Sequence, residues 1–390
     1  MKCISLLLAF VSVQMSLAQV FHDDYFRSRA EQGLDLTYNF EFEEAEDVFE
    51  DLLEAYQDHP APYFLLATNR WWQSYITIDE TYHAYIEEQL DLALDKNEGL
   101  EDRDEAHLEY VFFQYMCYAF KTRLHTLRRE WLSAANEGRK ALPYLRDGLD
   151  YARSSPEFYF SAGIYHYYAA TYPDKHYYVR PFMIFFPDGD EEKGIEELEL
   201  AANTPNFAQP EAMYYLGDIY LQRTGALEQG IEMKRQLHRA YPNNSWFKVD
   251  YAKGLIHAQQ YEEADILLTE MIAEFENLPD HRHRLISSLE STLSTQVMDR
   301  VYHYQGVVLM RYYQAYEQAI EHFGISLELG ELGDWDISPL PPSNYLHIGL
   351  CYDRLEMRGD AIEAYESALD FDQADHVEVR AKACLKDPCK

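Results

Sequence analysis

The sequence predicts an all-α protein built as a solenoid, an array of antiparallel helix hairpins stacked side by side. The main evidence is a block at residues 345–368, where aromatic and small residues recur three or four positions apart. That spacing places them on one face of each of two consecutive helices. Weaker copies of the block recur along the chain, and prolines separate them. Together these observations indicate repeated hairpins.

Within the block, small residues stand where two helices of a hairpin would approach each other. Gly349 and Ala361 lack bulk at those positions, while Tyr345, Tyr352 and Tyr365 fill the space beside them. Close packing of this kind brings helix axes near together. The pattern therefore predicts one compact hairpin.

The turn of this hairpin is assigned to Arg358-Gly359-Asp360. Glycine adopts a left-handed backbone without a steric penalty, and aspartate is a favoured residue at the start of a helix. We therefore expect Gly359 to form the turn and Asp360 to cap the second helix.

Weaker copies of the block cover most of the remaining chain. Gly33 and Ala45 keep the twelve-residue step that separates Gly349 from Ala361. Other units are centred on Gly217 and on Ala252 with Ala264, and degenerate ones cover 60–97, 103–150, 156–203 and 281–330. The sequence thus predicts roughly eight hairpins between residues 26 and 375.

This pattern resembles the tetratricopeptide repeat (TPR), a unit of about 34 residues with aromatic, Leu-Gly, aromatic, Ala, aromatic and Ala positions. The resemblance implies a right-handed superhelical solenoid over residues 19–375, followed by a tail at 376–390. It also implies a non-catalytic scaffold that binds a protein or peptide partner, without a cofactor.

Composition narrows the classes of partner. The chain has 390 residues and a formal net charge of -35, with 68 acidic against 33 basic residues. Such a field repels phosphate backbones and anionic bilayers, so nucleic acid and membrane insertion are not expected. The 33 tyrosines suit thin layers of helices that lie close to water.

Residues 1–18 have the features of a cleavable signal peptide. Lys2 precedes an apolar run from Ile4 to Val13, and the small residue Ala18 ends the segment before Gln19. Cys3 lies ahead of the apolar run, where it does not form a lipoprotein cleavage site. We therefore expect a periplasmic or secreted protein.

Cysteine spacing is informative at the C-terminus. Cys384 and Cys389 lie close together, so an oxidising compartment could join them in a small loop. They also resemble half of a zinc site, but the sequence has no second pair, and no metal is expected. Cys117 and Cys351 lie in apolar helical stretches, where buried free thiols are typical.

Residues 172–190 depart from the repeat as an aromatic insert in the fourth unit. Pro173, Pro181 and Pro187 disfavour a continuous helix there. The rings either fold back onto the solenoid or form a binding rim. Residues 163–168 and 189–194 also resemble a segment of exported bacterial TPR proteins, some of which serve periplasmic transport systems. The alternative function is therefore an accessory or small-ligand-binding subunit of such a system.

No catalytic motif stands out in the sequence. Nucleophile elbows, phosphate loops and zinc helices are missing. His281 and His283 point to different faces of a helix. His166, Asp174 and His176 straddle the aromatic insert and could meet in space, but sequence spacing outside a helix or strand fixes no metal-binding geometry. The sequence predicts no enzyme.

The TPR resemblance implies that positions two, five, nine and twelve of each unit face a concave groove. With Gly349 at position eight, Asp353 is at twelve, and one of the weaker units is counted from Val307. The resulting groove candidates are Trp71, Tyr167, Tyr214, Asp218, Trp246, Lys253, Tyr304, Arg311 and Asp353. Aromatic anchors with a few charges are typical of peptide recognition, although the same rings could only pack neighbouring hairpins.

Overall fold

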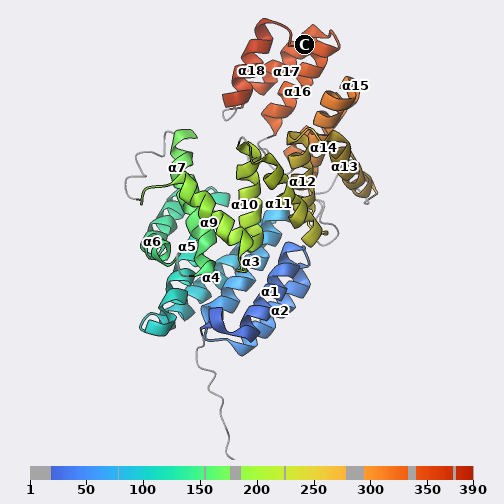
Figure 1. Cartoon of the computed structure of the whole chain (residues 1–390). Helices are drawn as coiled ribbons and strands as arrows, with labels where there is room; N and C mark the ends of the chain where they lie inside the picture. The colour runs from blue at the N-terminus through green and yellow to red at the C-terminus, as the bar shows by residue number, and fades with distance from the viewer. Residues whose placement is uncertain are drawn as a thin grey trace, which may run out of the picture.

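The computed structural model describes residues 19–77, 79–152, 155–175, 186–223, 225–277, 294–332, 340–371 and 375–389. Its helices form consecutive antiparallel pairs (Figure 1). The pairs are α1 (Asp24–Tyr38) with α2 (Phe42–Ala55), α3 (Pro60–Thr77) with α4 (His83–Asn97), α5 (His107–Leu127) with α6 (Trp131–Tyr151), α7 (Tyr159–Lys175) with α9 (Glu191–Asn203), α10 (Gln209–Gln222) with α11 (Leu227–Ala240), α12 (Ser245–His257) with α13 (Tyr261–Glu276), α14 (Thr295–Val308) with α15 (Tyr316–Leu332), and α16 (Pro341–Arg354) with α17 (Arg358–Ala368). These pairs confirm the predicted all-helical solenoid.

A bare glycine backbone under an aromatic ring fixes the distance between the two helices of a hairpin. A Cβ built on Gly349 would lie 2.4 Å from Cε1 of Tyr365, which is too close for any side chain. Each ring belongs to the second helix of the hairpin whose first helix carries the glycine. The contact pairs Gly33 with Phe49, Gly306 with Phe323 and Gly349 with Tyr365.

The turns of these hairpins differ from the sequence prediction. The residue two positions before the second helix has a left-handed backbone in six hairpins, at Phe40, Arg129, Gly225, Gln259, Gln314 and Glu356. In the C-terminal hairpin the turn residue is thus Glu356 (φ 62°), while Gly359 and Asp360 lie in the first turn of α17. Non-glycine residues enter this region at a modest cost, which helix packing offsets.

The expected tail at 376–390 is mostly a helix. Residues Asp375–Lys386 form α18, which packs on α16 and α17 with Val377, Ala381 and Cys384 buried. Cys384 and Cys389 are joined by a disulfide with an S–S distance of 2.02 Å. The helix covers the apolar face that the last hairpin would otherwise expose, as terminal repeats of solenoids require.

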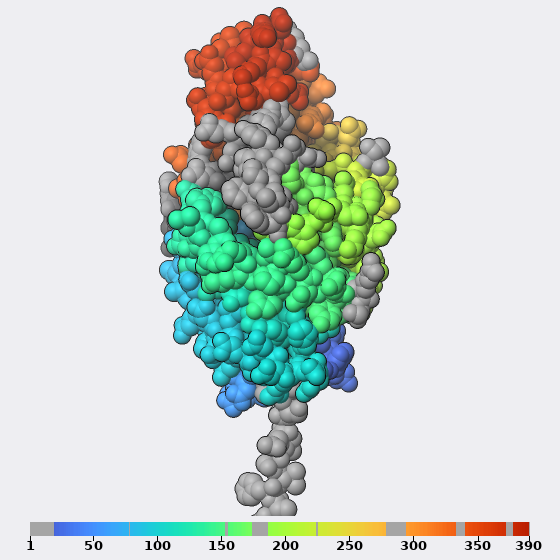
Figure 2. Space-filling view, turned by 90° about the vertical axis from the view of Figure 1, so that its left-hand side faces the viewer, coloured from blue at the N-terminus to red at the C-terminus, as the bar shows by residue number. Residues whose placement is uncertain are grey.

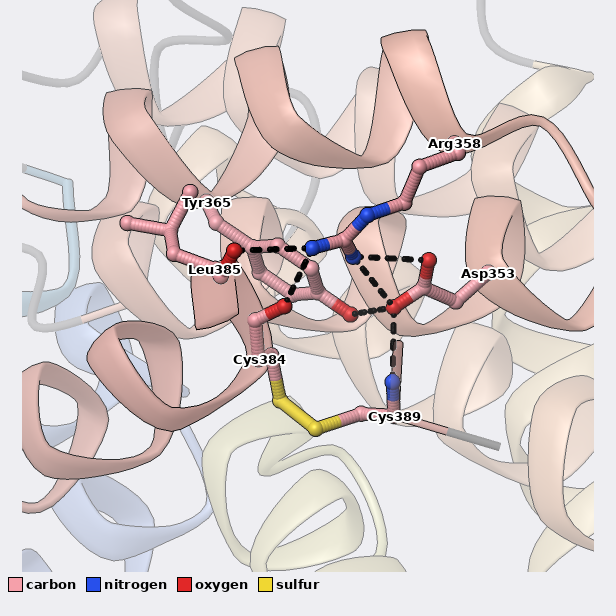
Figure 3. Close-up of a disulfide and its surroundings, with 6 residues drawn as sticks. All are labelled: Asp353, Arg358, Tyr365, Cys384, Leu385 and Cys389. Atoms are coloured by element: carbon pink, nitrogen blue, oxygen red, sulfur yellow. Dashed lines mark hydrogen bonds and ion pairs between the residues drawn. A yellow bond between two sulfur atoms is a disulfide. The ribbon is translucent and has the colours of Figure 1, made fainter. Parts of the chain in front are cut away.

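A buried carboxylate ties the chain end to the last hairpin (Figure 3). Asp353 accepts hydrogen bonds from Arg358 (3.0 Å), the Tyr365 hydroxyl (2.9 Å) and the Cys389 backbone amide (2.8 Å). The Arg358 guanidinium also donates to the carbonyl oxygen of Cys384 at 2.8 Å. Because Asp353 is only 2% exposed, these three donors account for its charge inside the protein.

The connection between α11 and α12 contacts the first helix of the array, α1. The Asn244 side chain, just before α12, donates to the carbonyl oxygen of Tyr38 at 2.7 Å, and the Tyr241 hydroxyl reaches Asp35 at 2.9 Å. At the other end of α1, the Arg27 guanidinium lies 5.2 Å from the ring centroid of Phe207. The first six hairpins therefore close into a ring.

The aromatic insert is described only at its ends. Helix α7 continues through Pro173 to Lys175, which differs from the expected break at the first proline. The Asp190 amide donates to the carbonyl oxygen of His166 at 3.0 Å, and Gly189 lies directly against the backbone of Ala170. Residues 176–185 and the predicted signal peptide at 1–18 lie outside the described residues.

Glycine packing in the last hairpin leads to a stability prediction. Gly349→Ala should lower the free energy of unfolding by about 2 kcal/mol, because the new methyl group overlaps Tyr365. Urea unfolding followed by circular dichroism measures the change. Gly359→Ala is the control: no atom lies within 4 Å of its built Cβ, so it should be neutral or slightly stabilising. Equal effects of the two variants would contradict the packing role.

The buried carboxylate leads to a second prediction. Asp353→Asn should lower the free energy of unfolding by about 3 kcal/mol, because it removes the charge that Arg358 and the Cys389 amide contact. The exposed Asp360→Asn, in the same hairpin, should change it by less than about 0.5 kcal/mol. Thermal unfolding compares them, and a small loss for Asp353→Asn would show that the buried charge is not needed.

Candidate functional site

The ring encloses a cavity of about 390 Å³. Its wall comes mainly from the first helices of successive hairpins, α1, α3, α5, α7, α10 and α12, and is predominantly apolar. The second helices stand outside this inner layer. Figure 2 shows one side of the molecule, with α16, α17 and α18 in red standing beyond the ring at one end.

A chain of aromatic rings forms much of the wall. Trp71 stacks on Tyr75 with centroids 5.1 Å apart, and Trp72 meets Trp71 edge to face at 5.2 Å. Tyr75 continues the chain to Trp246 on α12 at 5.8 Å. The Trp246 indole then donates a hydrogen bond to the Tyr214 hydroxyl at 3.2 Å. Rings from α3, α10 and α12 thus form one continuous surface.

Arg123 is the only basic residue in the cavity lining among the described residues. Its guanidinium carbon lies 3.9 Å from the ring centroid of Trp71 and 5.3 Å from that of Phe120. The side chain is exposed, which places it where the cavity meets solvent, and it makes no ion pair with a described residue. Beside it, the Trp71 indole N–H is buried without a hydrogen-bond partner in the described structure.

Glu211 on α10 places a carboxyl group in the mainly apolar lining of the cavity. Burial raises the pKa of Glu211 to about 7, although the Tyr38 hydroxyl donates a hydrogen bond to it and Arg123 lies near enough to oppose the shift. Burial and the neighbouring Glu211 together raise the pKa of Tyr38 well above its usual value. Because both pKa values are raised, each of the two groups keeps its proton to a higher pH than it would on the surface.

A cluster of two lysines and two aspartates borders the cavity at α10, α11 and α12. Lys234 is fully buried and contacts Asp218 at 2.8 Å as well as Asp250. Lys253 contacts Asp218 at 2.9 Å and Asp250 at 3.5 Å. Burial alone would raise the pKa of Asp218, but the two lysines outweigh it and the pKa is lowered. The four charges cancel within the cluster.

Four of the nine groove candidates line the cavity together: Trp71, Tyr214, Asp218 and Trp246. Lys253 lies next to them in the charge cluster. Tyr167 is 9% exposed and packs in the core between α7 and α9, with its backbone against Gly194. Tyr167 is therefore part of the hairpin packing.

Three candidates lie away from the cavity lining. The unit counted from Val307 is shifted by one residue, because Gly306 carries the ring contact with Phe323; Tyr304 and Arg311 therefore lose their ligand-facing positions. Tyr304 packs beside the core of α12 and α14, and Arg311 is exposed in the π-helical turn Leu309–Tyr313. The carboxylate of Asp353 is held in the C-terminal contacts instead of facing a groove.

Arg123 and Glu211 were not among the predicted candidates. Arg123 lies in the degenerate unit 103–150, where no glycine and alanine pair fixed the register. A helical stripe in α5 does point to it, since the lining residues of that helix recur at helical spacing. They are Phe112, Phe113, Tyr115, Met116, Ala119, Phe120 and Arg123.

The described residues contain no group of three His, Cys, Asp or Glu side chains placed to hold a metal ion. Both ring nitrogens of His166 are engaged, by Glu197 at 2.5 Å and Lys193 at 3.0 Å. His176, His281 and His283 lie outside the described residues. None of the helices in the described ranges combines the length and apolarity that crossing a bilayer requires.

The pKa of Glu211 leads to a pH prediction. Because the folded pKa of about 7 exceeds the value of 4.5 in an unfolded chain, its stabilising contribution is complete below pH 4.5 and is lost as pH rises through 7. Glu211→Gln should therefore match wild type at pH 4.5 and exceed its unfolding free energy at pH 8 by up to about 3 kcal/mol.

Urea unfolding of both proteins at both pH values measures this difference. Subtracting the wild-type value at the same pH removes the contributions of the other ionisable groups. The exposed Glu228→Gln on α11 is the control and should follow wild type at both pH values. A constant offset between Glu211→Gln and wild type would mean that Glu211 does not titrate in this range.

No family model matches the chain, and no curated protein matches it. Similar solved structures include a human IFIT1 dimer with PPP-AAAA (13% identity over 85% of this chain and 69% of that chain, TM-score 0.45) and yeast Tom70 (12%, 93% and 95%, TM-score 0.33). Another is the C-terminal part of a TPR repeat-containing protein from Cytophaga hutchinsonii (12%, 90% and 98%, TM-score 0.23). Stacked hairpins with ring-on-glycine packing and left-handed turn residues make this chain a TPR-like helical repeat protein.

Proposed function

We propose that this chain is a non-catalytic binding protein that captures a protein or peptide partner, with the cavity as its anchoring site. The observation that carries the proposal is the convergence of six first helices on one cavity rich in aromatic rings. Rigid rings in a desolvated pocket contribute much of the affinity in protein recognition, because they lose little conformational entropy on binding.

A binding role is also supported by the way the ionisable groups of the cavity are used. Asp218 is neutralised by Lys234 and Lys253, and Glu211 is bonded to Tyr38. Catalysis would require a nucleophile or base facing the ligand with a partner that activates it. In the described lining both acids, Glu211 and Asp218, are engaged by these partners, and most of the remaining surface is apolar.

We further propose that the protein works in the periplasm or outside the cell. The signal-like segment at 1–18 is the main support. The disulfide between Cys384 and Cys389 suits an oxidising compartment. Cleavage after Ala18 would also leave the described fold intact, because the packed core begins after that point, with Val20 and Phe21 buried against the helices.

A second candidate function is binding of a small molecule, and ring closure is the observation that favours it. Asn244 and Tyr241 hold the α11–α12 connection against the end of α1, so the inner face is a cavity that meets solvent at Arg123 and not an open trough. A volume of about 390 Å³ falls in the usual range for small-ligand pockets.

Capture of a partner tests the main proposal. Tagged full-length protein should retain a stoichiometric partner, and Trp71→Ala or Tyr214→Ala should weaken retention at least tenfold, because each ring lines the anchoring cavity. Quantitative mass spectrometry of the retained proteins, with circular dichroism to verify folding, measures the effect.

Trp131→Ala is the matched control, since Trp131 is 64% exposed on α6 and does not line the cavity. It should retain the partner fully. If no protein is retained and a small molecule co-purifies, the second candidate replaces the first. Loss of the partner in Trp131→Ala but not in Trp71→Ala would place recognition outside the cavity.

A further inference from the structure

We infer that the cavity binds a free organic monocarboxylate, with its apolar body among the aromatic rings and its carboxylate on Arg123. This inference rests on the second candidate function, small-ligand binding, and specifies the ligand chemistry. Three features of the described structure support it: the apolar wall, the placement of Arg123 and the compensation of Asp218 by Lys234.

The wall determines what the body of the ligand must be. Trp71, Tyr75 and Trp246 present ring faces and edges, and the α5 side adds residues such as Met116 and Phe120. Most of this wall is apolar, and a polar group placed against its apolar part would lose water without gaining a partner, which costs free energy. An aliphatic or aromatic body is therefore favoured, with its length limited by a volume of about 390 Å³.

Arg123 determines where the charge of the ligand must be. One face of its guanidinium is occupied by Trp71 at 3.9 Å, but stacking leaves the N–H groups in the guanidinium plane available. A carboxylate accepts two such hydrogen bonds at once, and charge-assisted pairs are stronger than neutral ones. In a chain with 68 acidic and 33 basic residues, an arginine in a cavity lining without a described acidic partner is notable.

Most of the remaining charges at the cavity are compensated. Lys234 and Lys253 compensate Asp218 and Asp250, so that cluster contributes no net charge. The Glu211 carboxyl is bonded to the Tyr38 hydroxyl on the wall. Arg123 supplies the basic group of the described lining, which attracts an anion, and Glu211 is the acid that the anion must avoid.

One carboxylate is the preferred number. Arg123 is the only basic residue in the described lining, and the rest of the wall is mainly apolar apart from the engaged acids. A second carboxylate on the same ligand would be buried without a partner or would approach Glu211, and both are unfavourable. The ligand is therefore a monocarboxylate, with an uncharged apolar tail.

Decanoate and decanamide test the inference, because they share an apolar chain and differ in charge. Binding to the full-length protein is followed by tryptophan fluorescence, since Trp71, Trp72 and Trp246 line the cavity, and by calorimetry. Decanoate should bind at least about tenfold more tightly than decanamide. Arg123→Gln should remove this preference, and Arg123→Lys, which keeps the charge, should retain part of it.

Arg311→Gln is the matched control, because Arg311 is an exposed arginine outside the cavity lining. It should keep the full preference for decanoate; an equal loss in this variant would assign the preference to overall charge and overturn the inference. Equal binding of decanoate and decanamide would overturn the carboxylate site while leaving small-ligand binding intact. Failure of the wild-type protein to bind either compound would reject both the carboxylate site and the small-ligand function.

Discussion

The contact between the two ends of the ring is the constraint on which the cavity depends. Asn244 and Tyr241 reach the last turn of α1 from a connection about two hundred residues later, at 2.7 Å from the Tyr38 carbonyl oxygen and 2.9 Å from Asp35. Without this contact, the first helices of the hairpins would line an open trough. With it, they surround a cavity that meets solvent at Arg123, and Tyr38 brings both its carbonyl group and its ring into the closure.

Closely paired helices make hairpins of the ring thin. In the first hairpin, for example, the Phe49 ring lies directly on the Gly33 backbone. The second helices consequently form an outer layer, and the large side chains of the first helices point into the ring. Tyr38, Trp71 and Trp246 therefore meet in one cavity although they belong to distant hairpins. The same packing that stabilises each repeat thus creates the candidate binding site.

The repeated hairpins were predictable from the sequence, whereas structural features that occur only once, such as the ring closure, were not. The step from Gly349 to Ala361 predicted the hairpin correctly, because both residues act within one local unit. Ring closure depends on contacts between residues far apart, which no local pattern encodes. The turn at Glu356 was missed for a different reason: a left-handed non-glycine residue is held there by the packing of the helices around it. Arg123 was missed because its unit has no glycine landmark.

The functional proposals depend on the ring being closed in solution, because an open array would not surround the apolar body of a ligand with the rings of the first helices. The most direct test is the distance between spin labels attached through introduced cysteines at Glu31 on α1 and Arg239 on α11, both exposed beside the closure. Pulsed electron paramagnetic resonance should give one narrow distance distribution for a closed ring. A broad distribution, or two separate populations, would show that the ring opens and would contradict an enclosed cavity.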